Sequence, residues 1–318
     1  MSTIDRVRIV EVGPRDGLQN APKVLPPTLR VELIRRLVQA GCSTIEAAAF
    51  VSPDWVPQMA QSADVLRAVP RTGAVRYSAL VPNFKGGRQA IEAGADELTV
   101  FISASETFSF RNVNCSIDES VARAATVAEL ARQNRRRLRG IVSCAFGCPY
   151  EGVVAYGSVS RAVTSLLAIG CEEIAIADTI GVASAGEVRT RLRDIAREIA
   201  VERLAVHFHD TYGQGLSNIL ASIDLGIRII DTSIAGLGGC PYAPGASGNV
   251  ATEDVVYMLD GLGLYTGLDL DALIETGSLI CSALDHGETT SRVARAVAAT
   301  RRHRGPIYER RLVTGSSR

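Results

Sequence analysis

Two histidines separated by a single residue, His207 and His209 in "LAVHFHDTYGQG", have a spacing that suits metal binding. Because successive side chains of a strand point to opposite faces, both imidazoles should project the same way, roughly 6 to 7 Å apart, with Phe208 facing away. Hydrogen-bonded core histidines are the alternative interpretation. The choice between these interpretations depends on which polar residues the rest of the chain brings to the same place.

The overall composition is that of a globular protein with a small-molecule substrate. The chain has 318 residues, with 34 Lys and Arg against 34 Asp and Glu. Hydrophobic residues make up 47% of the chain. A net charge of zero provides no field to recruit nucleic acid or an anionic membrane, so neither is an expected partner. The positive charge is almost all arginine, since Lys23 and Lys85 are the only lysines.

Cysteine usage and the absence of targeting signals predict a cytoplasmic protein. Seven cysteines, an odd number scattered among apolar segments, suit a reducing compartment better than a disulfide framework. Cys144 and Cys148 lack the second pair that a structural zinc site requires, and we interpret them as packing residues. The N-terminus enters a strand-like run directly, and no apolar stretch has the length of a membrane span.

A recurring phrase predicts the elements that must position the histidines. In "LVQAGCSTIEAAAF", "AIEAGADELTVFI", "LLAIGCEEIAIAD" and "ASIDLGIRIIDTS", a helix-like segment is followed by a glycine and a short apolar strand. Glycine just past a helix takes the left-handed conformation that turns the chain into the next strand. Each phrase, at Gly41, Gly94, Gly170 and Gly226, is therefore a helix-to-strand junction.

Strands alternating with helices predict a (β/α)8 TIM barrel with extra C-terminal helices. The eight expected strands are apolar runs near 8–12, 44–50, 75–81, 97–103, 138–145, 173–178, 203–209 and 228–234. A doubly wound sheet is the rival fold, but "EVGPRDGLQ" lacks a dinucleotide fingerprint. We place the barrel domain, with its C-terminal helices, at 1–285, and a helical extension with a mobile polar tail at 286–318.

In a TIM barrel the chemistry lies at the carboxyl ends of the strands, and polar residues gather at several of the expected ends. Mixed imidazole, carboxylate and amide ligands with positions left open favour Mg²⁺ or Mn²⁺ over a closed structural zinc site. The candidate ligands are Asp16, His207, His209 and Asn249. The other polar residues at these ends are Arg15, Gln19, Glu46, Asp178, Thr179 and Cys240.

For three of these residues the sequence suggests a specific role. Arg15 is a candidate for holding a substrate carboxylate or an oxyanion, although a surface salt bridge is the commoner fate of an arginine. Glu46 lies in an apolar strand and should need a partner, so we expect an ion pair with Arg15. Cys240, in the loop "AGLGGCPYAPGASGN", is either a small buried residue or a reactive thiol.

Six motifs in order resemble the 3-hydroxy-3-methylglutaryl-CoA lyase family over residues 7 to 285. They are "VEVGPRDGLQN", "FVSPDWVPQM", "SCAFGCPYEG", "ADTIG", "AVHFHDTYGQ" and "GLGGCPYAPGASGNVATEDVVYML". The resemblance implies divalent-cation-dependent cleavage of 3-hydroxy-3-methylglutaryl-CoA to acetyl-CoA and acetoacetate, a reaction of leucine degradation and ketone-body formation. It also implies an acyl-CoA thioester as partner, and we expect a homo-oligomer, most simply a dimer.

The resemblance assigns a role to each candidate residue. Asp16, His207, His209 and Asn249 would bind the metal, and Arg15 would stabilise the enolate oxygen with support from Glu46. Cys240 would take part in proton transfer, and Asp178 would belong to the catalytic polar shell. Gln19 and Thr179, which follow the same strand ends, are the further residues that we assign to substrate binding.

The chemistry itself supports a metal route. Cleaving a carbon–carbon bond beside a tertiary alcohol requires loss of the hydroxyl proton and a place for the electrons left on the thioester, and a cation that binds the hydroxyl lowers its pKa. One donor placed like Arg15 is typically worth roughly 3 to 4 kcal/mol in the transition state. Neither Lys23 nor Lys85 falls in a strand, which argues against a Schiff base.

Departures from the family pattern leave alternatives open. Ile141, Ala47 and Ala48 stand where tyrosine and threonines are usual, and Phe208 replaces the common cysteine between the histidines. A larger or less polar acyl pocket would suit a bulkier 3-substituted 3-hydroxyglutaryl-CoA. A synthase condensing an acyl-CoA with a 2-oxo acid, and a catalytically silent binding barrel, are the other hypotheses.

Overall fold

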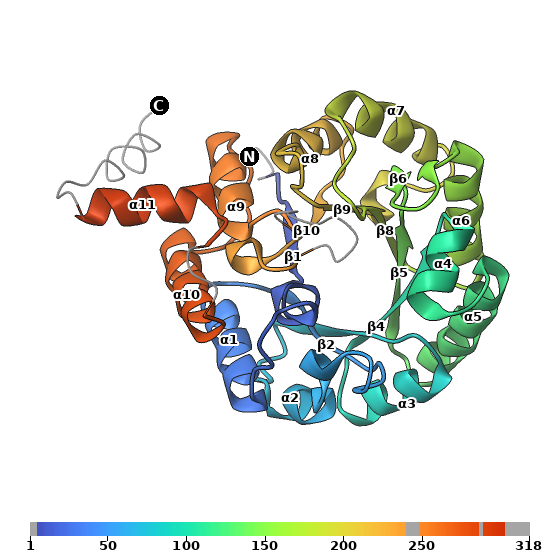
Figure 1. Ribbon diagram of the computed structural model, residues 1–318, viewed down its shortest axis with the longest axis horizontal. Coiled ribbons are helices and arrows are strands. Elements are labelled where there is room, and N and C mark those ends of the chain that lie inside the picture. The colour runs from blue at the N-terminus through green and yellow to red at the C-terminus, as the bar shows by residue number, and fades with distance from the viewer. Residues whose placement is uncertain (1–4, 240–247, 286–288, 303–318) are drawn as a thin grey trace.

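A computed structural model describes residues 5–239, 248–285 and 289–302 of the chain. Within these residues, eight parallel strands close into a barrel in the order β1, β10, β9, β8, β5, β4, β3, β2. Helices surround the strands as an outer ring, and the C-terminal helix projects from one side (Figure 1). The predicted (β/α)8 barrel is confirmed, and the doubly wound alternative is excluded.

The strands lie where the apolar runs predicted them, with ends shifted by a few residues. Glu11, at the end of the first strand, pairs with Thr232 on one side and Ile45 on the other, which closes the cylinder. The barrel strands are β1 (Arg8–Glu11), β2 (Thr44–Ala49), β3 (Arg76–Leu80), β4 (Glu97–Ser103), β5 (Arg137–Ser143), β8 (Glu173–Asp178), β9 (Leu204–Phe208) and β10 (Ile229–Thr232).

Helices connect the strands, and a small hairpin interrupts the connection after β5. The hairpin pairs β6 (Gly147–Cys148) with β7 (Gly152–Val153). The helices that follow barrel strands are α1 (Pro27–Gln39), α2 (Ser62–Ala68), α3 (Phe84–Glu92), α4 (Glu106–Val113), α5 (Ile117–Gln133), α6 (Tyr156–Ala168), α7 (Ala185–Ile195), α8 (Gly215–Ile223) and α9 (Thr252–Gly261).

The four junction glycines adopt the predicted left-handed conformation, with φ between 91° and 97°. At Gly41 the neighbouring chain also requires glycine, because a side-chain carbon there would lie 2.4 Å from the carbonyl oxygen of Gly267. This contact ties the α1 to β2 junction to the segment that leads into α10 (Leu270–Ala283).

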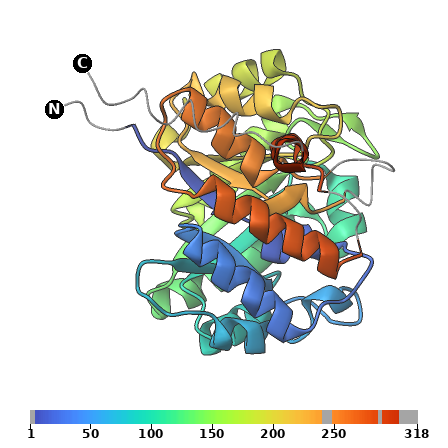
Figure 2. The ribbon, with the colours of Figure 1, turned by 90° about the vertical axis from the view of Figure 1, so that its left-hand side faces the viewer.

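The C-terminal helices cover one side of the barrel. Helix α10 packs against α1, and α11 (Arg292–Arg302) packs against α9 (Figure 2). A small apolar cluster of Ile274, Ala294 and Val297 joins α10 to α11. The boundary that we placed at residue 285 remains a prediction. Among the described helices, none is both long enough and apolar enough to cross a bilayer.

The barrel interior contains charged side chains as well as apolar ones. Glu46, Glu97, Arg139, Glu173 and Asp231 are all buried on barrel strands. Burying charges is costly unless they are paired and hydrogen-bonded, so each must be explained by its contacts. Some of these contacts lead to the candidate site.

Candidate metal centre

The end of β9 presents both imidazoles to one side, as the strand spacing predicted. The ring centroids of His207 and His209 are 5.4 Å apart, and both residues are buried. Phe208 packs into the hydrophobic core instead. The strand alternation therefore delivers two nitrogen ligands to the mouth of the barrel.

Asp16 reaches the histidines through one turn of π-helix, Gly13–Gly17, that follows β1. The amides of Arg15, Asp16 and Gly17 all point to the carbonyl of Val12, at 3.1, 2.7 and 3.3 Å. Single π-turns are rare and often occur at functional sites. Potential ligand atoms of Asp16, His207 and His209 lie within 4.8 Å of one another, which is close enough for a shared cation.

Asn249 arrives from a segment that pairs with the end of β9. Its backbone forms a bridge with His209, flanked by hydrogen bonds from Asp210 N to Gly248 O (2.8 Å) and from Val250 N to Phe208 O (3.3 Å). Its Nδ2 donates to Asp16 Oδ2 at 2.7 Å and to Leu237 O at 3.1 Å. All four predicted ligand residues therefore meet, although Asn249 turns its amide nitrogen, and not its oxygen, toward Asp16.

The protonation states of His209 and Asp16 suit a cation. Burial and the neighbouring His207 lower the pKa of His209 to about 4, so this imidazole is neutral at pH 7. Burial opposes ionisation of Asp16, but Arg15 and the imidazoles outweigh it and hold the carboxyl pKa below its usual range. Nδ1 of His209 is buried without a hydrogen-bond partner among the described residues. A buried imidazole nitrogen left unpaired is what a site awaiting a metal would contain.

Arg15 is clamped between two carboxylates. Its Nε donates to Glu46 Oε2 and its Nη1 to Asp16 Oδ1, each at 2.6 Å, while Nη1 also approaches Gln19 Oε1 at 3.4 Å. The ion pair expected between Arg15 and Glu46 is confirmed. Because Arg15 is only 5% exposed, the surface salt bridge that we considered is excluded.

Asp178 and Thr179 make contacts that shape loops. Both carboxylate oxygens of Asp178 accept backbone N–H groups, from Val182 at 3.1 Å and Ala183 at 2.9 Å. Burial raises the pKa of Asp178 to about 6, although these amides oppose the rise. Thr179 Oγ1 accepts the N–H of Cys144 at 2.8 Å. These bonds hold the loops after β5 and β8, and the predicted catalytic and substrate contacts of the two residues stay predictions.

Cys240 lies outside the described residues, so its place relative to the ligands stays a prediction. The two glycines before it are described, and Gly238 has a φ of 113°. A side-chain carbon at Gly238 would lie 2.6 Å from Asn249 Nδ2 and 3.3 Å from the α-carbon of Gly17. Gly238 therefore packs closely against the segments that contain Asn249 and Asp16, and only glycine fits at this position.

The sequence reasoning missed two buried residues behind the site, Asp231 on β10 and Arg139 on β5. Asp231 contacts His207 Nδ1 at 3.2 Å, and Arg139 binds Asp231 through two nitrogens. A signal was available, because "RIIDTS" and "LRGIV" each place a charge in an apolar strand. Like Glu46, a charged residue in an apolar strand needs a partner when it is buried.

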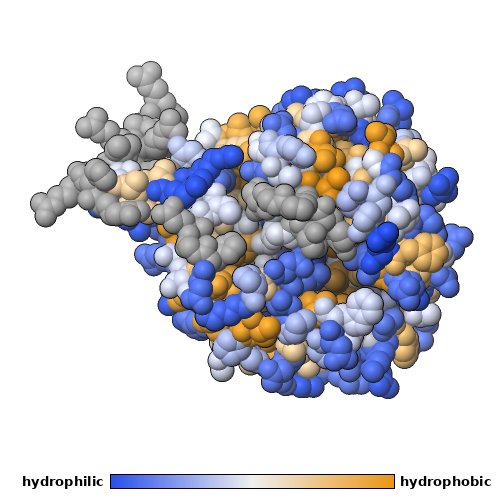
Figure 3. Space-filling model, in the orientation of Figure 1, coloured by the Kyte–Doolittle hydropathy of each residue, from blue (hydrophilic) through white to orange (hydrophobic). Residues whose placement is uncertain are grey.

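A hollow of about 510 Å³ adjoins the candidate site. Its lining includes Gln19, which contacts Arg15, and the exposed Trp55. This volume falls in the usual range of small-molecule pockets. The face shown in Figure 3 mixes hydrophilic and hydrophobic patches.

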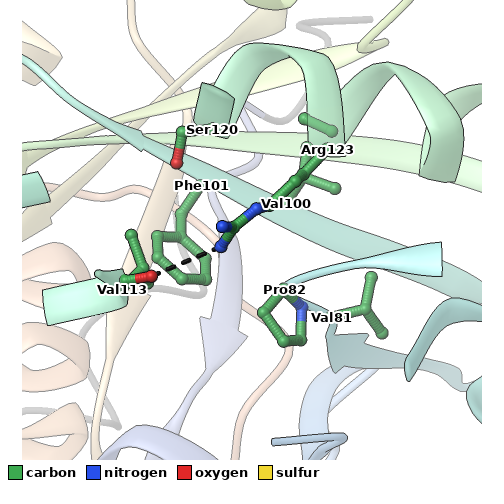
Figure 4. A pocket seen from close by; sticks show the side chains of 8 residues that line it. Val81, Pro82, Val100, Phe101, Val113, Ser120 and Arg123 are labelled. Carbon is green, nitrogen blue, oxygen red and sulfur yellow. Dashed lines mark hydrogen bonds between the residues drawn. The ribbon is translucent and has the colours of Figure 1, made fainter. Parts of the chain in front are cut away.

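A second hollow lies beside β3 and β4, where Arg123 donates to the carbonyl of Val113 (Figure 4). Its volume is about 10 Å³, room for about one water molecule. It shares no residue with the ligand cluster. The larger hollow is therefore the candidate for substrate.

Comparisons with known proteins agree with this geometry. The profile of the HMGL-like family matches residues 6–280. Mitochondrial hydroxymethylglutaryl-CoA lyase of Rattus norvegicus is 51% identical over 291 residues, which cover 92% of this chain and 89% of the rat protein. Other relatives at similar identity are named as cytoplasmic lyases.

Two solved structures share the fold over nearly the whole chain. Hydroxymethylglutaryl-CoA lyase from Pseudomonas aeruginosa has 49% identity and a TM-score of 0.90, covering 94% of this chain and 99% of that one. An HMG-CoA lyase from Acinetobacter baumannii in complex with coenzyme A and 3-methylmalate has 39% identity and a TM-score of 0.89, covering 93% and 97%. The chain therefore belongs to the HMGL-like family of divalent-metal-dependent enzymes, together with the hydroxymethylglutaryl-CoA lyases.

Proposed function

We propose that the protein cleaves 3-hydroxy-3-methylglutaryl-CoA to acetyl-CoA and acetoacetate at the cluster of Asp16, His207 and His209. The observation that carries this proposal is the convergence of one carboxylate and two imidazoles within 4.8 Å at the mouth of a barrel with this family membership. The relatives are named for this reaction, and one of them binds coenzyme A.

The ligand set fits Mg²⁺ or Mn²⁺. A bound divalent cation would supply Lewis acidity, lowering the pKa of the substrate hydroxyl and polarising the departing ketone. Asp16 and the two histidines would hold it, because their side chains already converge. Asn249 would add its amide oxygen only after its carboxamide turns over, since Nδ2 now donates to Asp16 and Leu237.

Arg15 is placed to stabilise negative charge that develops on the thioester. Its Nη1 bonds Asp16, so the guanidinium lies beside the position where the substrate would meet the cation. Glu46 contacts Nε and Nη2 of Arg15 and so fixes the orientation of the guanidinium. A donor held in place before the reaction costs no reorganisation during it, which is how such groups accelerate enolate formation.

The remaining roles follow from position along the loops. The hollow beside Gln19 and Trp55 would accommodate part of the acyl-CoA. Asp178 and Thr179 would hold the loops after β8 and β5 at the mouth. Cys240, which lies outside the described residues, would take part in proton transfer, as the family resemblance implies. A homodimer and a cytoplasmic location remain our predictions.

The direct test is a product assay with the full-length protein and Mg²⁺ or Mn²⁺. Release of acetoacetate and acetyl-CoA from 3-hydroxy-3-methylglutaryl-CoA, abolished by EDTA and restored by the cation, is the expected result. A panel of 3-substituted 3-hydroxyglutaryl thioesters then measures how Ile141, Ala47 and Ala48 set the acyl preference. Release of CoA only when acetyl-CoA and a 2-oxo acid are supplied together would replace the lyase with a synthase.

A further inference from the structure

The two histidines of the cluster differ in the contacts of Nδ1. His207 Nδ1 lies 3.2 Å from Asp231 Oδ2, and its Nε2 faces Asp16 Oδ2 at 3.9 Å. Nδ1 of His209, by contrast, has no hydrogen-bond partner among the described residues. The ring of His207 therefore has a carboxylate partner on Nδ1, whereas no described residue bonds Nδ1 of His209.

Asp231 is itself fixed by a chain of buried charges that crosses the barrel. Arg139 binds it with Nη2 on Oδ1 at 2.6 Å and Nη1 on Oδ2 at 3.2 Å. The same guanidinium donates Nε to Glu173 at 2.8 Å, and Glu173 pairs in turn with Arg8. A two-pronged contact of this kind sets the plane of a carboxylate as well as its place.

The register of the barrel makes this arrangement rigid. Asp231 and His207 are direct partners in the pairing of β10 with β9, so their backbones cannot separate without opening the barrel. Arg139 and Glu173 are likewise paired across β5 and β8.

We propose that Asp231, held by Arg139, is a positioning residue that fixes the ring plane and tautomer of His207. Both oxygens of Asp231 already accept from Arg139, so its contact with His207 is one in which Nδ1 donates, which leaves Nε2 without a proton toward Asp16. A carboxylate behind an imidazole also raises its strength as a metal ligand. This inference rests on the proposed metal site and adds a residue that touches neither cation nor substrate.

Metal affinity of the Asp231→Asn variant tests the inference. Titration calorimetry with Mn²⁺ should show binding weaker by about 10- to 100-fold, the usual effect of losing such a partner. The matched control is Glu97→Gln, which removes another buried carboxylate paired with arginines, Arg76 and Arg137. That control should lose stability without a change in Mn²⁺ affinity.

The wild-type protein provides a second measurement that needs no variant. Nitrogen-15 NMR of the histidine rings at mildly alkaline pH should place the proton of His207 on Nδ1. A proton on Nε2, or Mn²⁺ binding by Asp231→Asn within about twofold of wild type, would overturn the inference while leaving the lyase proposal intact. Failure of the wild type to bind Mn²⁺ or to cleave the thioester would instead overturn the proposed function.

Discussion

Two groups of carboxylates lie near the carboxyl ends of the strands, and their surroundings differ in charge. In the metal centre, the partly exposed Asp16 is surrounded by Arg15, two imidazoles and the amide of Asn249. Nearby, the buried Glu11 and Glu253 accept hydrogen bonds from neutral donors among the described residues. Glu11 accepts from Gly13 N, Ile234 N and Thr252 Oγ1 at 2.6 to 2.9 Å, and Glu253 accepts from Ala235 N at 3.0 and 3.1 Å.

This difference in surroundings determines which carboxylate is ionised and able to bind a cation. Burial raises the pKa of Glu11 to about 7 and that of Glu253 to about 8, because neutral donors offset little of the desolvation. Arginine and imidazoles instead keep Asp16 charged. The first pair holds the backbone of the loop after β10, where Ala235 has a φ of 57°. The second arrangement maintains an anion that a cation can bind.

The largest expected effect comes from removing a ligand. His207→Ala should weaken Mn²⁺ binding by more than about 100-fold, beyond the loss of an outer partner, and should abolish cleavage. The barrel core should survive, because His207 points out of the apolar packing. Calorimetry and the acetoacetate assay measure both effects, and near-normal turnover at limiting metal would contradict the ligand assignment.

The neighbouring residue supplies the matched control for that variant. Phe208→Leu changes a core side chain that faces away from the cluster. It should cost about 1 kcal/mol of unfolding free energy and leave Mn²⁺ affinity unchanged. A loss of metal binding in this variant would show that His207→Ala acts through the fold.

Cys240→Ser should have the next largest effect. If the thiol protonates the enolate, turnover should fall by about 100-fold or more, within the range for general acid catalysis, while Mn²⁺ affinity stays constant. Steady-state kinetics under reducing conditions, together with calorimetry, separate the two readouts. Unchanged turnover would make Cys240 a packing residue.

The pair Glu11 and Glu253 should make stability depend on pH. Their folded-state pKa values lie above the ordinary 4.5, so the folded protein binds protons more tightly than the unfolded chain up to pH of about 8. The contribution of these groups to the free energy of unfolding should therefore be full below pH 4.5 and decline between pH 4.5 and about 8. It should fall as pH rises, by at most about 1.4 kcal/mol per pH unit for each group.

Urea unfolding of Glu253→Gln across this pH window measures the contribution of one group. The amide cannot ionise, so the decline in stability should be shallower than in the wild type. An identical slope would mean that Glu253 does not titrate in this range. The Mn²⁺ affinity of the variant at neutral pH should match that of the wild type, because Glu253 is not a proposed metal ligand.

The smallest effect is expected at Thr252, whose hydroxyl donates to Glu11 at 2.6 Å and meets Thr232 Oγ1 at 2.8 Å. Thr252→Val should cost about 1 kcal/mol, the typical value of one hydrogen bond, with some further loss from the unpaired carboxylate. Thermal unfolding measures this cost. Altered metal affinity would show that the two groups are coupled.

The fold was predictable because its signals are local and repeated. Four helix-to-strand junctions contain a glycine that takes a left-handed conformation, and eight apolar runs mark the barrel strands. The short β6 and β7 hairpin was not foreseen. Two-residue strands lack the length over which an alternating pattern can be read.

The candidate site was predictable as a set of residues but not as a set of contacts. The strand period placed His207 and His209 on one side, and burial required a partner for Glu46. The amide orientation of Asn249 depends on Leu237 and Asp16, residues 12 and 233 positions away. Contacts of that range carry no local signature.

The polar residues at the barrel mouth can be predicted from the order of residues alone, because strand ends in a closed parallel barrel all open on the same face. The three-dimensional contacts are needed to show that Asp231 bonds His207 and which carboxylates are charged. Those outcomes depend on strand register, which sets Asp231 beside His207, and on how far each buried carboxylate lies from an arginine. Electrostatic energy in a low-dielectric interior varies steeply with such distances.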